Sequence, residues 1–123
     1  MDKRVIAALV ALPLIGILGC GGYSAPTAPQ NEGGPPDGAV IINVLGINGT
    51  QSFSPNPATV PAGQTVVWHN VDSTTHRVVL DDGRLDTGNI SPGRFSTATT
   101  LPGSGPYHCA IHPPMVGTLR AGQ

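Results

Sequence analysis

Charged and aromatic residues are scarce in this chain of 123 residues, at 11% and 4% of the sequence. Six Lys and Arg residues nearly balance seven acidic residues, and the formal net charge is -1. Nothing in this balance indicates a nucleic-acid-binding surface. There are only two cysteines, whereas Gly and Pro are abundant at 17 and 13 residues. Because Gly and Pro interrupt helices, we expect one small domain of short strands joined by turns.

The N-terminus lacks an uninterrupted hydrophobic run of membrane-spanning length. The apolar stretch at 5–18 is broken by a proline and a glycine and follows a basic start, which is typical of a secretory signal. The segment ends in Gly19-Cys20, which resembles the lipobox of bacterial lipoproteins, where the cysteine carries lipid. We therefore expect a lipoprotein signal at 1–19 and lipidation at Cys20. A plain secretory signal and an ordinary buried helix are the alternatives.

The remaining chain divides by composition. Residues 20–38 are rich in Gly and Pro and show no apolar periodicity, so we expect a flexible tether after the lipidated cysteine. Residues 39–123 contain the apolar runs and form the predicted domain. This organisation predicts an exported protein that is lipid-anchored to the bacterial cell membrane or outer membrane, with its domain in the periplasm or extracytoplasmic space.

Short apolar runs between turn signals predict that the domain is all-β. We expect an antiparallel β-sandwich or small barrel of about seven or eight strands. The expected strand segments lie at 40–45, around Phe53, and at 58–60, 64–70, 76–80, 94–101, 106–109 and 115–120.

Four side chains with metal-binding donors have a spacing that predicts one site. Cys109, His112 and Met115 fall within seven residues between two predicted strands, and His76 opens an earlier strand. One Cys, two His and a weak axial Met are the ligands of a blue-copper site. Because a thioether binds Cu(I) well and hard cations poorly, Met115 favours copper.

These motifs resemble those of the cupredoxins, specifically the plastocyanin/amicyanin-like group. The resemblance covers nearly all of 39–120 and lies in Phe53-Ser54-Pro55, Pro61-Ala62-Gly63-Gln64-Thr65-Val66-Val67-Trp68, Asn70 six residues before His76, Leu85-Asp86-Thr87-Gly88, Ser91-Pro92-Gly93 and the short Cys-x2-His-x2-Met loop. It implies a Greek-key sandwich with one type 1 copper ion, whose ligands are His76, Cys109, His112 and Met115. It also implies one-electron transfer between redox partners, such as a c-type cytochrome or a membrane oxidoreductase.

Strand alternation places further residues relative to the predicted site. Trp68 and Asn70 share an inward face, and the resemblance implies that the Asn70 amide ties the ligand-bearing loops together. His69 and His108 are expected to face outward, as exposed strand residues without a ligand role.

Other functions use the same residue types. A copper-binding or trafficking protein without an electron-carrier role is the main alternative. A zinc enzyme with Cys and His ligands lacks a candidate general base near the ligand run. A Cys-His hydrolase does not explain the second histidine and the methionine. We therefore expect a monomeric electron carrier that is not an enzyme.

Overall fold

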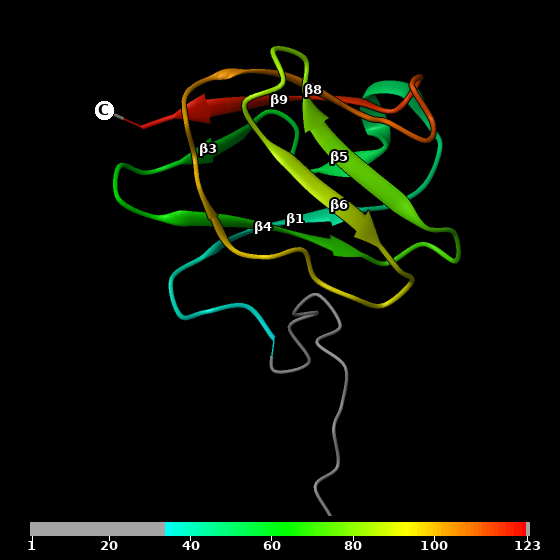
Figure 1. The fold of residues 1–123 in the computed structure, drawn as a ribbon, viewed down its shortest axis with the longest axis horizontal. Helices are drawn as coiled ribbons and strands as arrows, with labels where there is room; N and C mark the ends of the chain where they lie inside the picture. Colours follow the sequence, from blue (N-terminus) through cyan, green and yellow to red (C-terminus); the bar gives the residue numbers. More distant parts are fainter. Residues whose placement is uncertain (1–33, 123) are drawn as a thin grey trace, which may run out of the picture.

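The computed structural model describes residues 34–122 (Figure 1). The predicted signal at 1–19, the predicted lipidation site Cys20 and most of the predicted tether at 20–38 lie outside the described residues. The strands all fall within the predicted domain at 39–123. Within residues 34–122, no helix has the length and apolarity needed to cross a membrane.

The described chain folds into short strands and one turn of 3-10 helix, as the frequent turn residues predict. The elements are β1 (Val40–Val44), η1 (Gly49–Gln51), β2 (Phe53–Ser54), β3 (Ala58–Val60), β4 (Thr65–Asn70), β5 (His76–Leu80), β6 (Asp86–Ile90), β7 (Thr99–Thr100), β8 (Gly105–Cys109) and β9 (Val116–Ala121).

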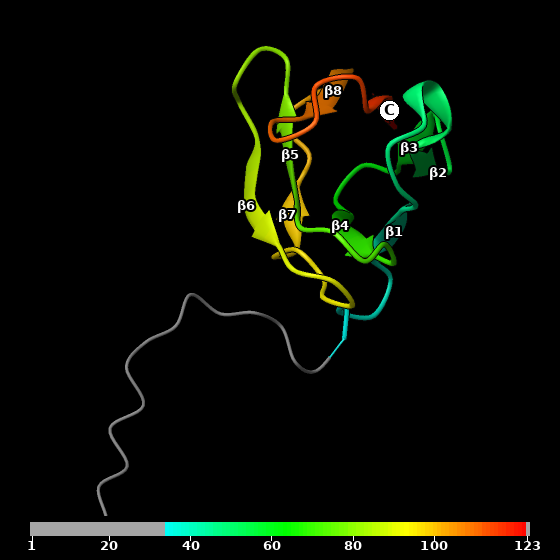
Figure 2. The same ribbon diagram turned by 90° about the vertical axis from the view of Figure 1, so that its right-hand side faces the viewer.

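These strands form two sheets, so the predicted β-sandwich is confirmed. One sheet has the order β2-β1-β4-β7 and the other has the order β3-β9-β8-β5-β6. Figure 2 shows β1 and β4 on one side of the sandwich and β5 and β6 on the other. The sheets are mixed and not purely antiparallel as expected, because β1 pairs parallel to β4 and β3 pairs parallel to β9, while the other strand pairs are antiparallel.

The core lies between the two sheets and follows the strand alternation. On β4, Val66, Trp68 and Asn70 are fully buried, as their shared parity predicts. Tyr107 of β8 is also buried and makes edge-on ring contacts with Trp68 and Phe53, at centroid distances of 5.6 and 4.8 Å. Burial raises the pKa of Tyr107, so its phenol stays protonated in this core.

Two segments differ from the expected strands. Residues 86–90 form β6 at the edge of the five-stranded sheet, although their polar sequence carries no apolar alternation. The predicted strand at 94–101 is reduced to β7 and an isolated bridge between His69 and Phe95. Backbone pairing with β5 and β4, and not side-chain patterning, decides where these edge segments are extended.

Three strand ends meet at one end of the sandwich. β4 ends at Asn70, β5 begins at His76, and β8 ends at Cys109. The loop at 71–75 and the loop at 110–115 therefore lie at the same end, on the right in Figure 1. This end of the fold brings together residues that are 33 positions apart.

Candidate metal centre

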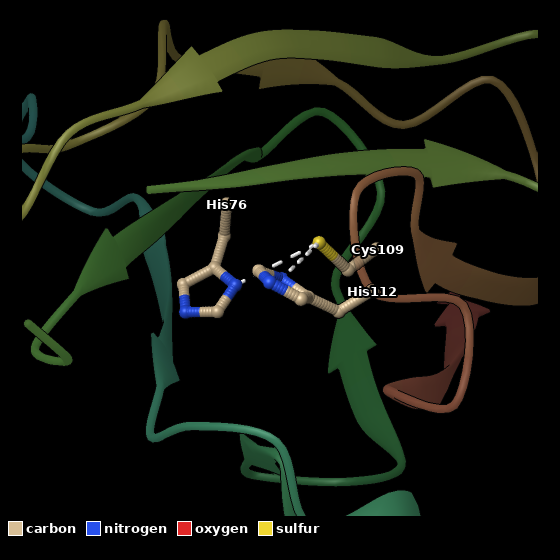
Figure 3. Close-up of side chains that lie close together, drawn as sticks. All are labelled: His76, Cys109 and His112. Atoms are coloured by element: carbon tan, nitrogen blue, oxygen red, sulfur yellow. Dashed lines mark hydrogen bonds between the residues drawn. The ribbon is translucent and has the colours of Figure 1, made fainter. Parts of the chain in front are cut away.

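Three of the four predicted ligands bring their donor atoms together. The Nδ1 atoms of His76 and His112 lie 3.7 and 3.8 Å from the Cys109 sulfur, and all three donor atoms lie within 4.8 Å of one another. Figure 3 shows both imidazoles directed toward the sulfur. His76 and Cys109 are fully buried, while His112 is partly exposed.

A tight loop after β8 places the donors that follow Cys109. The Cys109 N–H donates to the Met115 carbonyl at 3.0 Å, and the Met115 N–H donates to the His112 carbonyl at 3.0 Å. Pro113 and Pro114 fix their own φ angles within this loop. The loop conformation is therefore held by hydrogen bonds within its own backbone.

Met115 closes the loop and is fully buried. Its position immediately before β9 anchors it between the loop and a central strand. This burial keeps the thioether away from water at the metal-binding end. Its role as the fourth ligand stays a prediction.

A backbone group of β5 contacts the Cys109 sulfur. The Arg77 N–H donates to Sγ at 3.4 Å, and the Ala110 N–H donates to the Arg77 carbonyl at 2.7 Å. Strand β5 therefore supplies both a predicted ligand and a polar contact to the sulfur.

The second nitrogen of His76 has its own partner. His76 Nε2 lies 2.8 Å from Oδ2 of Asp72, in the loop between β4 and β5. The His76 side chain is fully buried, whereas the Asp72 side chain is 23% exposed. The hydrogen bond with His76, together with one from the Ser73 N–H, holds the pKa of Asp72 below its ordinary value.

Asn70 cross-links the loops around the site. Its Nδ2 donates to the carbonyls of Thr74 and Ile90, both at 2.8 Å, and its Oδ1 accepts from the Asp72 N–H at 3.0 Å. Asn70 is fully buried at the end of β4. Its amide thus joins the loop that precedes His76 to the end of β6.

The other two histidines lie away from the donor cluster. His69 is stacked on Phe95 with a centroid distance of 4.0 Å. His108 is partly exposed, and its Nδ1 lies 2.6 Å from Oδ1 of Asp81. Neither is a member of the donor group.

The chemistry of the donor set fits copper. A cysteine sulfur and two imidazoles at one end of the sandwich suit Cu and Zn, and the buried thioether of Met115, the predicted fourth ligand, would favour Cu. Carboxylates stay outside the donor group within residues 34–122, which disfavours Mg and Ca. His76, Cys109 and His112 therefore form a candidate copper site.

Asp72 is the functional candidate that sequence reasoning missed. An acidic residue four positions before a predicted ligand is common in loops, so the spacing alone carries little information. The contact between Asp72 and His76 depends on the conformation of the loop at 71–75, which Asn70 holds by a hydrogen bond.

Comparisons with known proteins agree with the fold and the donor cluster. No protein-family model matches the chain. The chain is 34% identical over 82 residues to chloroplastic plastocyanins of Oryza sativa subsp. indica and Hordeum vulgare. The match covers 56% of this chain and 53% of each plastocyanin, so it spans about half the length of these relatives.

Solved structures of amicyanin share the fold. A Cu(I) form of one amicyanin variant aligns with a TM-score of 0.56 and 25% identity, and covers 69% of this chain and 83% of the amicyanin. An oxidised form of another variant aligns with a TM-score of 0.57 and 24% identity over the same shares. The alignment thus extends over most of the amicyanin chain.

Proposed function

We propose that this cupredoxin-like chain, which is similar to plastocyanin in sequence, carries single electrons between redox proteins on one type 1 copper ion. The observation that carries the proposal is the cluster of the Cys109 sulfur and two histidine Nδ1 atoms, all within 4.8 Å of one another. The copper would supply the one-electron chemistry when bound. The protein would act as a carrier and not as an enzyme.

Each ligand residue has a separate role in this proposal. His76, Cys109 and His112 would form the trigonal plane, and Met115 would be the weak axial ligand. The axial ligand and the hydrogen bonding at the sulfur tune the potential of such a site, so Met115 and the Arg77 N–H are the tuning groups here.

The backbone around the ligands supports rapid electron exchange. Two hydrogen bonds close the 109–115 loop, and Asn70 fixes the loop on the opposite side of the site. We propose this tying of the loops as the role of Asn70. A site that is held in one geometry changes little between Cu(II) and Cu(I), so the reorganisation cost is small.

His112 offers a route for the electron to the surface. It is partly exposed, and its loop neighbours Ala110, Ile111, Pro113 and Pro114 are exposed. We call these four residues the apolar rim. A redox partner such as a c-type cytochrome or a membrane oxidoreductase would dock on this rim and dissociate quickly, because few charges hold it.

Membrane attachment is a further part of the proposal and rests on the sequence alone. Lipid on Cys20 would hold a monomeric domain in the periplasm or extracytoplasmic space through the tether at 20–38. An anchored carrier would then exchange electrons with partners at the same membrane surface.

A charge in the apolar rim is expected to slow electron exchange without loss of copper. Pro114→Glu places a charge beside His112, so we expect the bimolecular rate constant with a c-type cytochrome to fall about tenfold, within the range that interface mutations produce. Stopped-flow mixing of the reduced protein with the oxidised cytochrome measures this rate, and the visible spectrum reports the copper.

Gln64→Glu is the matched control for this experiment. Gln64 is exposed just before β4, roughly 20 Å along that strand from its metal-binding end. The control should exchange electrons at the rate of the unmodified protein. Equal rates for all three proteins would show that the partner does not dock on the rim, and no exchange with the unmodified protein would contradict the carrier role.

A further inference from the structure

The loop between β4 and β5 presents a carboxylate to the far side of a predicted copper ligand. Asp72 Oδ2 lies 2.8 Å from His76 Nε2, while His76 Nδ1 faces the Cys109 sulfur at 3.7 Å. The imidazole therefore lies between the carboxylate and the place where the donor atoms converge. Among residues 34–122, this is the one carboxylate that pairs with a member of the donor cluster.

Asp72 is itself held in place on several sides. Its N–H donates to Asn70 Oδ1 at 3.0 Å, and its Oδ1 accepts from the Ser73 N–H at 2.8 Å. Gly46, after β1, lies against the carboxylate, since a Cβ at this position would be 3.7 Å from the Asp72 Cγ. The carboxylate is therefore fixed by the fold and is not a freely rotating surface group.

This contact determines which nitrogen of His76 carries the proton. A carboxylate accepts a hydrogen bond, so Nε2 is the nitrogen that donates, and Nδ1 is the nitrogen whose lone pair is available to a metal at the cluster. A carboxylate on the outer nitrogen also raises the basicity of a metal-binding histidine and fixes its ring orientation. In addition, the negative charge of Asp72 favours the more positive of two metal oxidation states.

From these contacts we infer that Asp72 is a positioning residue that holds His76 in the Nε2–H form and lowers the reduction potential of the bound copper. The inference rests on the proposed copper site and goes beyond it, because a residue that is not a ligand would help to set the reduction potential of the copper. We expect the site to bind Cu(II) in preference to Cu(I) more strongly when the Asp72 carboxylate is present than when it is absent.

Asp72→Asn is the principal test. The change removes the negative charge and leaves an amide of similar size, so we expect the ratio of Cu(II) to Cu(I) affinity to fall about tenfold, at the lower end of the effect of outer-sphere partners. For a one-electron couple this corresponds to a rise in potential of about 59 mV. Redox titration followed in the visible spectrum measures the potential, and Asp72→Glu, which restores the charge, should recover part of the shift.

Asp81→Asn is the matched control. Asp81 forms the other His-carboxylate pair of the described chain, with His108, and lies beyond the opposite end of β5 from His76. The control removes a carboxylate charge beside a histidine that lies outside the donor cluster. The reduction potential of the copper in this variant should therefore equal that of the unmodified protein. Equal shifts in both variants would mean that net charge alone sets the potential, which overturns the inference.

A second measurement uses the unmodified protein and does not depend on how the variants fold. Nitrogen NMR of the copper-free protein should show the neutral His76 imidazole protonated at Nε2, and protonation at Nδ1 in place of Nε2 would overturn the inference. Failure of the inference is distinguishable from failure of the proposed function. A normal copper spectrum with an unchanged potential in Asp72→Asn rejects only the role of Asp72, whereas no copper spectrum in the unmodified protein rejects the copper site.

Discussion

Cys109→Ser is expected to abolish the intense visible absorption of the copper-loaded protein. Such absorption arises from charge transfer between a thiolate and Cu(II), and Cys109 is the free cysteine of the described residues. A serine hydroxyl is a harder and weaker donor, so we expect copper affinity to fall by at least about 100-fold, beyond the loss caused by outer-sphere changes. Optical titration with Cu(II) and competition with a chelator measure both effects.

Two variants make this result specific. His108→Ser changes the partly exposed neighbour of Cys109 and should leave the absorption intact. Met115→Leu removes the proposed axial thioether but keeps the thiolate, so the absorption should remain while the potential rises. Persistence of the intense band in Cys109→Ser would mean that another group provides the chromophore, and the proposed ligand set would then be wrong.

Gly117→Ala is expected to lower the free energy of unfolding by about 1–3 kcal/mol, the usual cost of overpacking a core. A Cβ at Gly117 would lie 2.3 Å from Cζ of Tyr107, which is too close for two carbon atoms that are not bonded to each other. The Tyr107 ring cannot move aside easily, because it is packed edge-on against Phe53 and Trp68. Urea unfolding of the copper-free protein measures the loss.

Gly105→Ala provides the control on the paired strand β8. There the added Cβ would meet Leu80 Cδ2 at 3.8 Å, an ordinary contact. We expect the free energy of unfolding to change by much less than in Gly117→Ala. Both variants replace Gly with Ala in a strand, so the difference in intrinsic strand propensity is common to both. Equal stabilities of the two variants would contradict the packing of Tyr107 against β9.

The sequence was informative where chemistry and periodicity coincide. The spacing of Cys109 and His112 predicts a tight loop between strands, and His76 at a strand start predicts convergence with it. The structure brings these three donors together. The inward parity of Trp68 and Asn70 was also predictable, because alternation places both on the same face of β4 as Val66.

Other features depend on pairing partners that local sequence does not specify. Strand β6 consists largely of polar residues and is extended because it pairs with β5. Val67 has outward parity, yet it is fully buried and lies outside the main core cluster. The parallel pairing of β1 with β4 likewise joins segments whose register is set by the whole sandwich.

The role assigned to Asp72 illustrates the same limit at the site. Its contact with His76 depends on the fold of a five-residue loop, which Asn70 fixes through the Thr74 carbonyl. Donor residues are recognisable by type and spacing, whereas the carboxylate beside His76 is recognisable only in three dimensions.

Whether the chain holds a type 1 copper ion that carries single electrons is tested by titration of the purified, unmodified protein with Cu(II), followed by stepwise one-electron reduction. We expect an intense visible thiolate-to-copper band that saturates at one copper per chain. The band should disappear on reduction and return fully on reoxidation. A folded protein that develops no such band, or that loses its copper on reduction, would contradict the assignment of a type 1 copper electron carrier.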